Sequence, residues 1–402
     1  MKNTLRPSVP PAPLPDTADS SREVWQAVRA LLVVTTILIA FGLTMLYSAS
    51  YGIAGLKYFR NQLIWITLGT AGAVGVFLAG YKKVAAKSTW WMLISFMLLM
   101  AACFLFKPVN GASRWIRLGS FSIQPSEFAK IAVAIFVAKY CADNARTFSL
   151  IRHRRGLLPL CAGAGTVILG ILMGRDLGTT ILVGTMTFFT MLAAGLFFRY
   201  LIIPVILGGV IAVYIKLFDP MRLARVVSFM NPEVVQKGKG YQLWNSLLAL
   251  GSGNWFGVGF MTSRLKAKYL PEAHTDFILA IVGEELGFVA MAAVILLYTL
   301  YGYYALRIAF RSGSRLGMLL GFALTLGVTV QAAINLAVVS GSAPTKGMPA
   351  PFISYGGSNM IACLLATGLL VSIAFDTIDP GYEERFAAKL PWRRKNKTLC
   401  SR

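Results

Sequence analysis

Acidic residues are scarce in this chain of 402 residues: it has 16 Asp and Glu against 39 Lys and Arg, and only two histidines. Charged residues of both signs make up 14% of the sequence, whereas apolar residues make up 56%. The surface of a soluble domain of this size needs more charge than that. The composition therefore excludes a soluble globular protein and predicts a helical protein that crosses the membrane several times.

Cysteine is also too sparse to crosslink the fold. There are five cysteines, and they show no paired spacing. Cys103, Cys141, Cys161 and Cys363 lie within apolar runs, and Cys400 lies in the C-terminal tail. We expect neither a disulfide nor a metal site from them, because both need cysteines at closely matched spacings.

Ten apolar runs are each long enough to cross a ~30 Å hydrocarbon core as a helix. They lie at about 28–50, 62–80, 88–106, 126–142, 157–174, 178–197, 200–218, 277–301, 316–340 and 354–376. We predict an all-α fold in which residues 28–378 form one membrane domain of ten transmembrane helices. A proline-rich tail at 1–27 and a basic tail at 379–402 would flank it, and 219–276 would form a long loop between the seventh and eighth helices.

The net charge of +23 fits this topology. When both termini are placed in the cytoplasm, the inner segments carry more Lys and Arg than the short outer loops, as the positive-inside rule requires. The long loop 219–276 is then extracytoplasmic, and the basic inner segments can meet anionic membrane lipid. Because the basic residues are spread over separate loops, we expect no nucleic-acid partner.

Segment 270–288 concentrates negative charge where a membrane span begins. It holds four of the 16 acidic residues, among them Asp276 and Glu284, and one of the two histidines, His274. Carboxylates at a bilayer boundary cost about 2–4 kcal/mol each, so their presence predicts function. We expect an active site here with Asp276 at its centre. The alternative is that Asp276 only caps the helix that follows.

Glu284 follows Asp276 by eight residues, which is about 80° around a helix. The two carboxylates are therefore predicted to face one cavity, whereas Glu285 points to the opposite side. The alternative for both glutamates is a buried ion pair with a basic residue of another helix, for which Lys130 and Arg175 are candidates.

Three further groups of polar residues lie at span ends. Arg114 precedes a helix that carries Glu127 and Lys130, Asp176 starts the sixth span, and Lys346 and Ser354 belong to a connection rich in Pro and Gly. All of them map to the outer face in the predicted topology, which indicates one extracytoplasmic site for an anionic, lipid-linked substrate. Structural alternatives are a Glu127–Lys130 pair at a helix start, an Asp176–Arg175 pair, and a tight turn around Ser354.

These motifs resemble those of the SEDS family (shape, elongation, division and sporulation), whose members include FtsW and RodA. The resemblance covers about residues 30–378 and rests on short motifs at 124–127, 176–179, 240–242, 251–253, 271–277, 284–288 and 344–358. Pro-Glu-Ala-His-Thr-Asp at 271–276 looks more like the division branch, FtsW, than the elongation branch, RodA. Two positions depart from the family pattern: Arg175 stands where proline is usual, and Asn254 replaces a usual glycine.

The resemblance implies a peptidoglycan glycosyltransferase of the bacterial cytoplasmic (inner) membrane. Such an enzyme polymerises lipid II into β-1,4 glycan strands at the outer face and releases undecaprenyl diphosphate. Its implied partners are a class B penicillin-binding transpeptidase and other divisome or elongasome proteins. The family's essential aspartate falls on Asp276, and its other sensitive polar positions fall on Arg114, Glu127, Lys130, Asp176, Lys346 and Ser354. From the residues themselves we add His274 and Glu284 as candidate substrate contacts.

We predict that Asp276 removes a proton from the 4-hydroxyl of the acceptor sugar, or places a divalent cation, Mg²⁺ or Mn²⁺, that does so. No tightly bound cofactor is expected. The diphosphate leaving group needs positive charge, which Arg114, Lys130 or Lys346 could supply. A lipid II flippase is disfavoured because charge clusters at the outer span ends, and a non-catalytic divisome scaffold would leave Asp276 dispensable. A ligase that transfers lipid-linked glycan to another acceptor is a nearby enzymatic alternative.

Overall fold

The computed structural model describes residues 17–108, 112–118, 121–144, 157–196, 240–268, 270, 272–382 and 384–385, with scattered positions between 200 and 230. Its helices are α1 (Thr17–Ala54), α2 (Lys57–Ala79), α3 (Tyr81–Ala86), α4 (Ser88–Phe104), α5 (Pro125–Asp143), α7 (Leu157–Met173), α8 (Leu177–Ala193), α11 (Tyr241–Ser252), α12 (Leu265–Lys268), α13 (Ile278–Phe310), α14 (Arg315–Val339) and α15 (Gly357–Ile378). The antiparallel strands β1 (Ile116–Leu118) and β2 (Phe121–Ile123) precede α5.

Within the described residues, nine of the ten predicted spans coincide with a helix, and the span at 200–218 lies largely outside them. Of these helices, α1, α2, α13, α14 and α15 are long and apolar enough to cross a membrane, while α4, α7 and α8 are shorter apolar helices. The chain is therefore a multi-pass helical membrane protein, and the number ten stays a prediction. In the predicted loop 219–276, the described residues form α11 and α12.

Both predicted tails contribute to the packed structure. Helix α1 begins at Thr17, inside the segment that we assigned to the proline-rich tail, and Val24 is buried there. At the other end, Tyr382 is fully buried, and its hydroxyl donates to the Phe77 carbonyl at 2.8 Å. Apolar and aromatic side chains near the two tail boundaries thus extend the bundle beyond the hydropathic spans.

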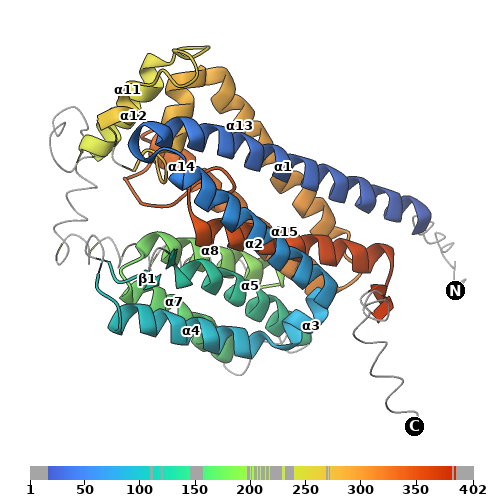
Figure 1. The fold of residues 1–402 in the computed structure, drawn as a ribbon. Helices are drawn as coiled ribbons and strands as arrows, with labels where there is room; N and C mark the ends of the chain where they lie inside the picture. Colours follow the sequence, from blue (N-terminus) through green and yellow to red (C-terminus); the bar gives the residue numbers. More distant parts are fainter. Residues whose placement is uncertain are drawn as a thin grey trace, which may run out of the picture.

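The helices form one bundle in which α2 packs along α15, and α13 packs between α1 and α14 (Figure 1). Small residues allow the close contact of α2 with α15, since a Cβ atom on Gly368 would lie 2.7 Å from the Ala73 carbonyl oxygen. Figure 1 shows β1, α11 and α12 gathered at one end of the bundle, and the start of α1 and the end of α15 at the other. The segments that hold the predicted site residues meet at the first of these ends.

Candidate active site

Asp276 lies at the end of the loop that leads into α13. The helix begins at Ile278 with Phe277 as its N-cap, and no side chain caps it. Asp276 therefore does not take the capping role that was its structural alternative. Among the described residues its carboxylate accepts no hydrogen bond, and the side chain is half-buried. The carboxylate is available to a substrate.

Arg114 brings a positive charge to Asp276. Its Nη1 atom is 3.8 Å from Asp176 Oδ1. A Cβ atom built on Gly347 would lie 2.8 Å from Asp276 Oδ2 and 3.5 Å from Arg114 Nη2, so Gly347 lies close beside both groups. Arg114 Nε is buried and finds no hydrogen-bond acceptor within the described part of the chain. The Arg114 side chain as a whole keeps 26% of its surface exposed, which leaves it accessible to an incoming oxyanion.

Asp176 anchors this arrangement. It is the N-cap of α8, where it accepts from the Thr179 backbone N–H at 3.2 Å. Its Oδ2 atom also accepts from Gln124 Nε2 at 2.9 Å and from Ser126 Oγ at 3.0 Å. These hydrogen bonds join α8 to the start of α5 and fix the Asp176 carboxylate in place. The Arg114 guanidinium therefore lies beside a carboxylate whose position is fixed.

Lys346 adds a second cation from the connection between α14 and α15. Its Nζ atom donates to the Leu177 carbonyl at 3.4 Å. Next to it, Met348 packs so closely on α8 that a Cβ atom on Gly178 would lie 2.9 Å from its sulfur. The connection therefore rests on the start of α8, beside the Arg114–Asp176 contact.

The surroundings raise the pKa of the Asp276 carboxyl from 3.8 to about 7. Burial is the main cause; Glu272 and Asp176 raise the pKa further, and Arg114 opposes them. A carboxyl group with a pKa near 7 can accept a proton with a useful driving force at neutral pH.

His274 packs among aromatic rings. Its ring centroid is 4.4 Å from that of Tyr58 and 6.0 Å from that of Tyr355, and its carbonyl accepts from the Tyr355 N–H at 3.0 Å. Burial lowers the pKa of His274, and the charge of Glu272 opposes this. The His274 ring thus supports the loop two residues before Asp276, and its burial favours the neutral form.

Lys130 and Glu127 form a buried ion pair in α5, with Nζ 2.6 Å from Oε2. Lys130 also donates to Gln331 Oε1 at 2.6 Å, and Gln331 Nε2 donates to the Pro349 carbonyl at 2.9 Å and to Asn359 Oδ1 at 2.8 Å. The Glu127–Lys130 pair, which was the structural alternative to a contact of Lys130 with the diphosphate, is present in the structure. This network lies behind the Lys346 connection and supports it.

Ser354 closes a turn in the same connection. Its hydroxyl accepts from the Ala350 N–H at 2.8 Å, and its carbonyl accepts from Gln62 Nε2 at 3.2 Å. Only 1% of Ser354 is exposed. The turn that was its structural alternative is the role that the structure shows.

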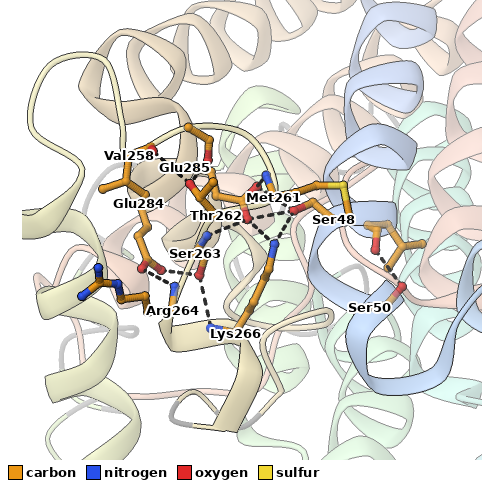
Figure 2. Close-up of polar contacts among 12 residues, drawn as sticks. Ser48, Ser50, Val258, Met261, Thr262, Ser263, Arg264, Lys266, Glu284 and Glu285 are labelled. Carbon is orange, nitrogen blue, oxygen red and sulfur yellow. Dashed lines mark hydrogen bonds and ion pairs between the residues drawn. The ribbon is translucent and has the colours of Figure 1, made fainter.

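Glu284 does not have the partners that we predicted (Figure 2). Its carboxylate accepts from the Ser263 hydroxyl and, at 2.9 Å, from the Arg264 backbone N–H. Lys130, one of the two candidate partners, pairs with Glu127 instead. The physical reason is that the loop between α11 and α12 lies against this part of α13 and supplies donors locally.

Glu285 is fully buried and binds α1 and the same loop. Its carboxylate accepts from the Ser48 hydroxyl at 2.6 Å, from Lys266 Nζ at 2.6 Å and from the Met261 N–H at 3.1 Å. Figure 2 shows Glu284 and Glu285 meeting one continuous loop, which reaches both side chains although they lie about 100° apart around the helix.

Helix α13 is also interrupted at Gly287, whose φ of 75° and ψ of −170° are not helical. The Glu284 and Glu285 carbonyls accept from the N–H groups of Val258 and Gly259 at 2.9 and 3.0 Å. The Phe288 N–H donates to the Asn254 carbonyl at 2.9 Å. The loop thereby satisfies backbone groups that the interruption frees, which membrane depth requires.

The described residues include no cluster of three or more His, Cys, Asp or Glu side chains that could hold a metal ion. Arg114 lies 3.8 Å from Asp176 and lowers the pKa of Asp276, and Asp176 is already occupied by hydrogen bonds. This donor set does not fit a tightly held metal, so no chemical step is assigned to one.

Comparison with known proteins identifies the fold. The sequence pattern of the cell cycle proteins FtsW, RodA and SpoVE matches residues 28–378. The chain belongs to this family. The resemblance to the SEDS family is thus confirmed, and the names of the relatives favour the FtsW branch.

Curated relatives cover nearly the same span. The chain is 34% identical over 353 residues to a Trichlorobacter lovleyi protein named "Probable peptidoglycan glycosyltransferase FtsW", covering 86% of this chain and 92% of that protein. It is also 34% identical over 356 residues to stage V sporulation protein E of Bacillus subtilis, covering 86% and 96% of the two chains.

Solved structures share the fold. A chain from a peptidoglycan synthase complex superposes with a TM-score of 0.71 at 23% identity, covering 87% of this chain and 98% of that one. The rod shape determining protein RodA of Thermus thermophilus gives a TM-score of 0.65 at 23% identity, covering 86% and 96%.

The two departures from the family pattern have visible backbone consequences. Arg175 adopts a φ of 60°, which a proline ring forbids, so the backbone before Asp176 differs from one that carries proline. Asn254 adopts a φ of 46°, a left-handed conformation that asparagine tolerates in place of glycine.

Several residues of the FtsW/RodA/SpoVE-type site escaped the sequence analysis. Gln331 and Asn335 lie in an apolar helix and contact the site from behind, and Gly347 touches Asp276 directly. A signal for the first two was present, because amides inside a membrane span are costly and are retained for a reason. Gly347 carried no signal beyond its place in a turn.

Proposed function

We propose that this protein is a peptidoglycan glycosyltransferase that polymerises lipid II into β-1,4 glycan strands, for septal cell-wall synthesis. The observation that carries the proposal is the Asp276 carboxylate, free of hydrogen bonds among the described residues and close to Arg114 and the Lys346 connection. Relatives at 34–36% identity are named peptidoglycan glycosyltransferases, which supports the same activity.

In the proposed reaction, the 4-hydroxyl oxygen of the acceptor sugar attacks the anomeric carbon of the donor. Asp276 takes the hydroxyl proton, the new carbon–oxygen bond forms, and the bond from the anomeric carbon to the diphosphate breaks. Attack from the opposite face converts the α-linked donor into a β-1,4 link. A base with a pKa of about 7 is ionised in a large fraction of molecules at neutral pH.

The leaving group is a diphosphate, which needs neutralisation of charge rather than a proton. Arg114 and Lys346 are the cations beside Asp276 that have partial exposure. Lys130 is only 5% exposed and is paired with Glu127, so we assign it to support of the Lys346 connection. A divalent cation carried in by the diphosphate would add to Arg114 and Lys346.

We place the site at the outer face of the bacterial cytoplasmic membrane, with ten transmembrane helices and both termini in the cytoplasm. The start of α1 and the end of α15 lie at the same end of the bundle, which supports placing both termini on one side of the membrane (Figure 1). A class B penicillin-binding transpeptidase is the proposed partner, since one solved structure with this fold is a chain of a peptidoglycan synthase complex.

The test is polymerisation of labelled lipid II by the purified protein with its transpeptidase. The wild type should form glycan ladders, and Asp276→Asn should lower the rate by about 10²-fold or more, because a positioned base contributes at least that much. Thr325→Val is the matched control, since within the described residues the Thr325 hydroxyl bonds only its own helix, at Gly321.

Equal ladders from wild type and Asp276→Asn would remove Asp276 from the reaction. If the wild type forms none while a known polymerase works in parallel, the polymerase proposal fails. The flippase and scaffold alternatives would then be tested by lipid II translocation and by partner binding.

A further inference from the structure

Asn335 is a buried amide in the apolar helix α14, with 1% of its surface exposed. Its Nδ2 atom donates to the Asp276 carbonyl at 2.8 Å and to the Met348 carbonyl at 2.7 Å. One side chain therefore ties the loop that carries the reactive carboxylate to the connection that carries Lys346.

The orientation of this amide is unambiguous. Both partners are carbonyl oxygens, which only accept, so the nitrogen must face both of them. This leaves Asn335 Oδ1 buried and without a hydrogen-bond partner among the described residues. An unsatisfied buried acceptor costs stability. A residue that served packing alone would be apolar here, so the two donated hydrogen bonds are the reason for an amide.

The position of the Asp276 backbone controls where its carboxylate lies. The Gly347 backbone is so close that a Cβ atom there would come within 2.8 Å of Asp276 Oδ2. The carboxylate itself accepts no hydrogen bond within the described part of the chain. The bond from Asn335 to the Asp276 carbonyl is thus the nearest polar restraint on this residue.

The remaining contacts of the connection do not depend on Asn335. Gln331 donates to the Pro349 carbonyl at 2.9 Å, and Ser354 accepts from the Ala350 N–H at 2.8 Å. These bonds keep the connection in place when the Asn335 amide is removed. Loss of the amide should therefore release the Asp276 loop selectively.

We propose that Asn335 is a positioning residue, which holds the Asp276 carboxylate between Gly347 and Arg114 through the Asp276 backbone. This inference rests on the proposed function of Asp276 as the base. It predicts that Asn335 acts on the chemical step and on the ionisation of Asp276, while binding of the substrate by Arg114 and Lys346 is little affected.

The experiment measures kcat and KM for lipid II polymerisation from pH 5.5 to 9 for wild type, Asn335→Leu, Asp276→Asn and Thr325→Val. In Asn335→Leu we expect kcat to fall by about 10- to 100-fold, as small displacements of a catalytic group do, with KM changed by less than about threefold. We also expect the midpoint of the acid limb to move to lower pH, because a released Asp276 is better solvated while Arg114, Glu272 and Asp176 are unchanged.

The pH midpoint separates positioning from general destabilisation. A variant that merely folds less well has fewer active molecules, which lowers kcat but leaves the midpoint unchanged. An unchanged midpoint, or an unchanged kcat, would overturn the inference. If Asn335→Leu does not fold, Asn335→Ser carries the same measurement with a smaller, still polar side chain. Absence of polymer from wild type would instead refute the proposed function itself, so the two failures are distinguishable.

Discussion

The rate of lipid II polymerisation should rise with pH through neutrality, because the proposed base must lose its proton first. The pKa of Asp276 is raised from 3.8 to about 7, mainly by burial. A group with that pKa is roughly 10% ionised at pH 6 and roughly 90% ionised at pH 8. The kcat of the wild type should therefore increase about tenfold over these two pH units, with a midpoint near 7.

Two substitutions should move this midpoint in opposite directions. Arg114 lowers the pKa of Asp276 and Glu272 raises it. Arg114→Gln should thus shift the acid limb to higher pH, and Glu272→Gln should shift it to lower pH. Both profiles are measured at a fixed, moderate ionic strength, because salt screens these interactions.

A profile that is flat between pH 6 and 8 would refute the assignment of Asp276 as the titrating base, provided that chemistry limits the rate. Shifts of the same sign in both variants would refute the electrostatic reasoning even if the wild-type midpoint agreed. Burial lowers the pKa of His274, which moves the titration of its ring toward the acid end of this range and away from the expected midpoint.

The same pKa shift predicts an effect on stability. Because the folded-state pKa is above the ordinary value, protonation of Asp276 contributes to the free energy of unfolding, in full below pH 3.8. This contribution is lost as the pH rises through 7. Each pKa unit is worth about 1.4 kcal/mol, which sets an upper bound of roughly 4 kcal/mol, and partial exposure of the side chain reduces it to about 1–2 kcal/mol. Asp276→Asn should therefore raise thermal stability in detergent at pH 8 and not at pH 4; equal effects at both would contradict burial of the ionised carboxylate as the cause. Two further predictions concern packing and charge. Gly347→Ala should lower kcat by about tenfold or more, because the new Cβ atom would displace Asp276 Oδ2, whereas Gly75→Ala, with open space around it, should leave kcat unchanged. Lys266→Met should lower the free energy of unfolding by about 3 kcal/mol, since it leaves the Glu285 carboxylate buried without a cation. Adding Glu285→Gln to Lys266→Met should recover part of that loss in thermal unfolding; no recovery would show that the ion pair is not the cause.

Much of the fold could be predicted from hydropathy, because a membrane-spanning helix must satisfy its own backbone and present apolar side chains along some 20 residues. Helices α13, α14 and α15 lie within a few residues of the spans expected at 277–301, 316–340 and 354–376, although α13 continues to Phe310. The helical turns before residue 28 were missed, because they pack on the bundle outside the hydropathic span.

Site residues were predictable in type but not in partnership. Charge at span ends marked Asp276, Arg114, Asp176 and Lys346, which the structure brings together. Glu284 carried the same signal, yet its partners are Ser263 and Arg264, in a loop that no helical periodicity could have placed there.

Hydropathy and charge along the chain were enough to show that the protein resides in a membrane, to predict most of its helices, and to mark the few charges that are costly at a membrane boundary. Those properties follow from local transfer free energies, which each segment carries alone. Only the packed structure shows which carboxylates form hydrogen bonds or ion pairs and which carboxylate forms none among the described residues. The Asp276 carboxylate is left without a hydrogen bond among the described residues, whereas Asp176, Glu127, Glu284 and Glu285 are each bound by residues distant in the sequence or by a nearby lysine. That division depends on how helices pack and where α13 is interrupted, and neither is a property of any single segment.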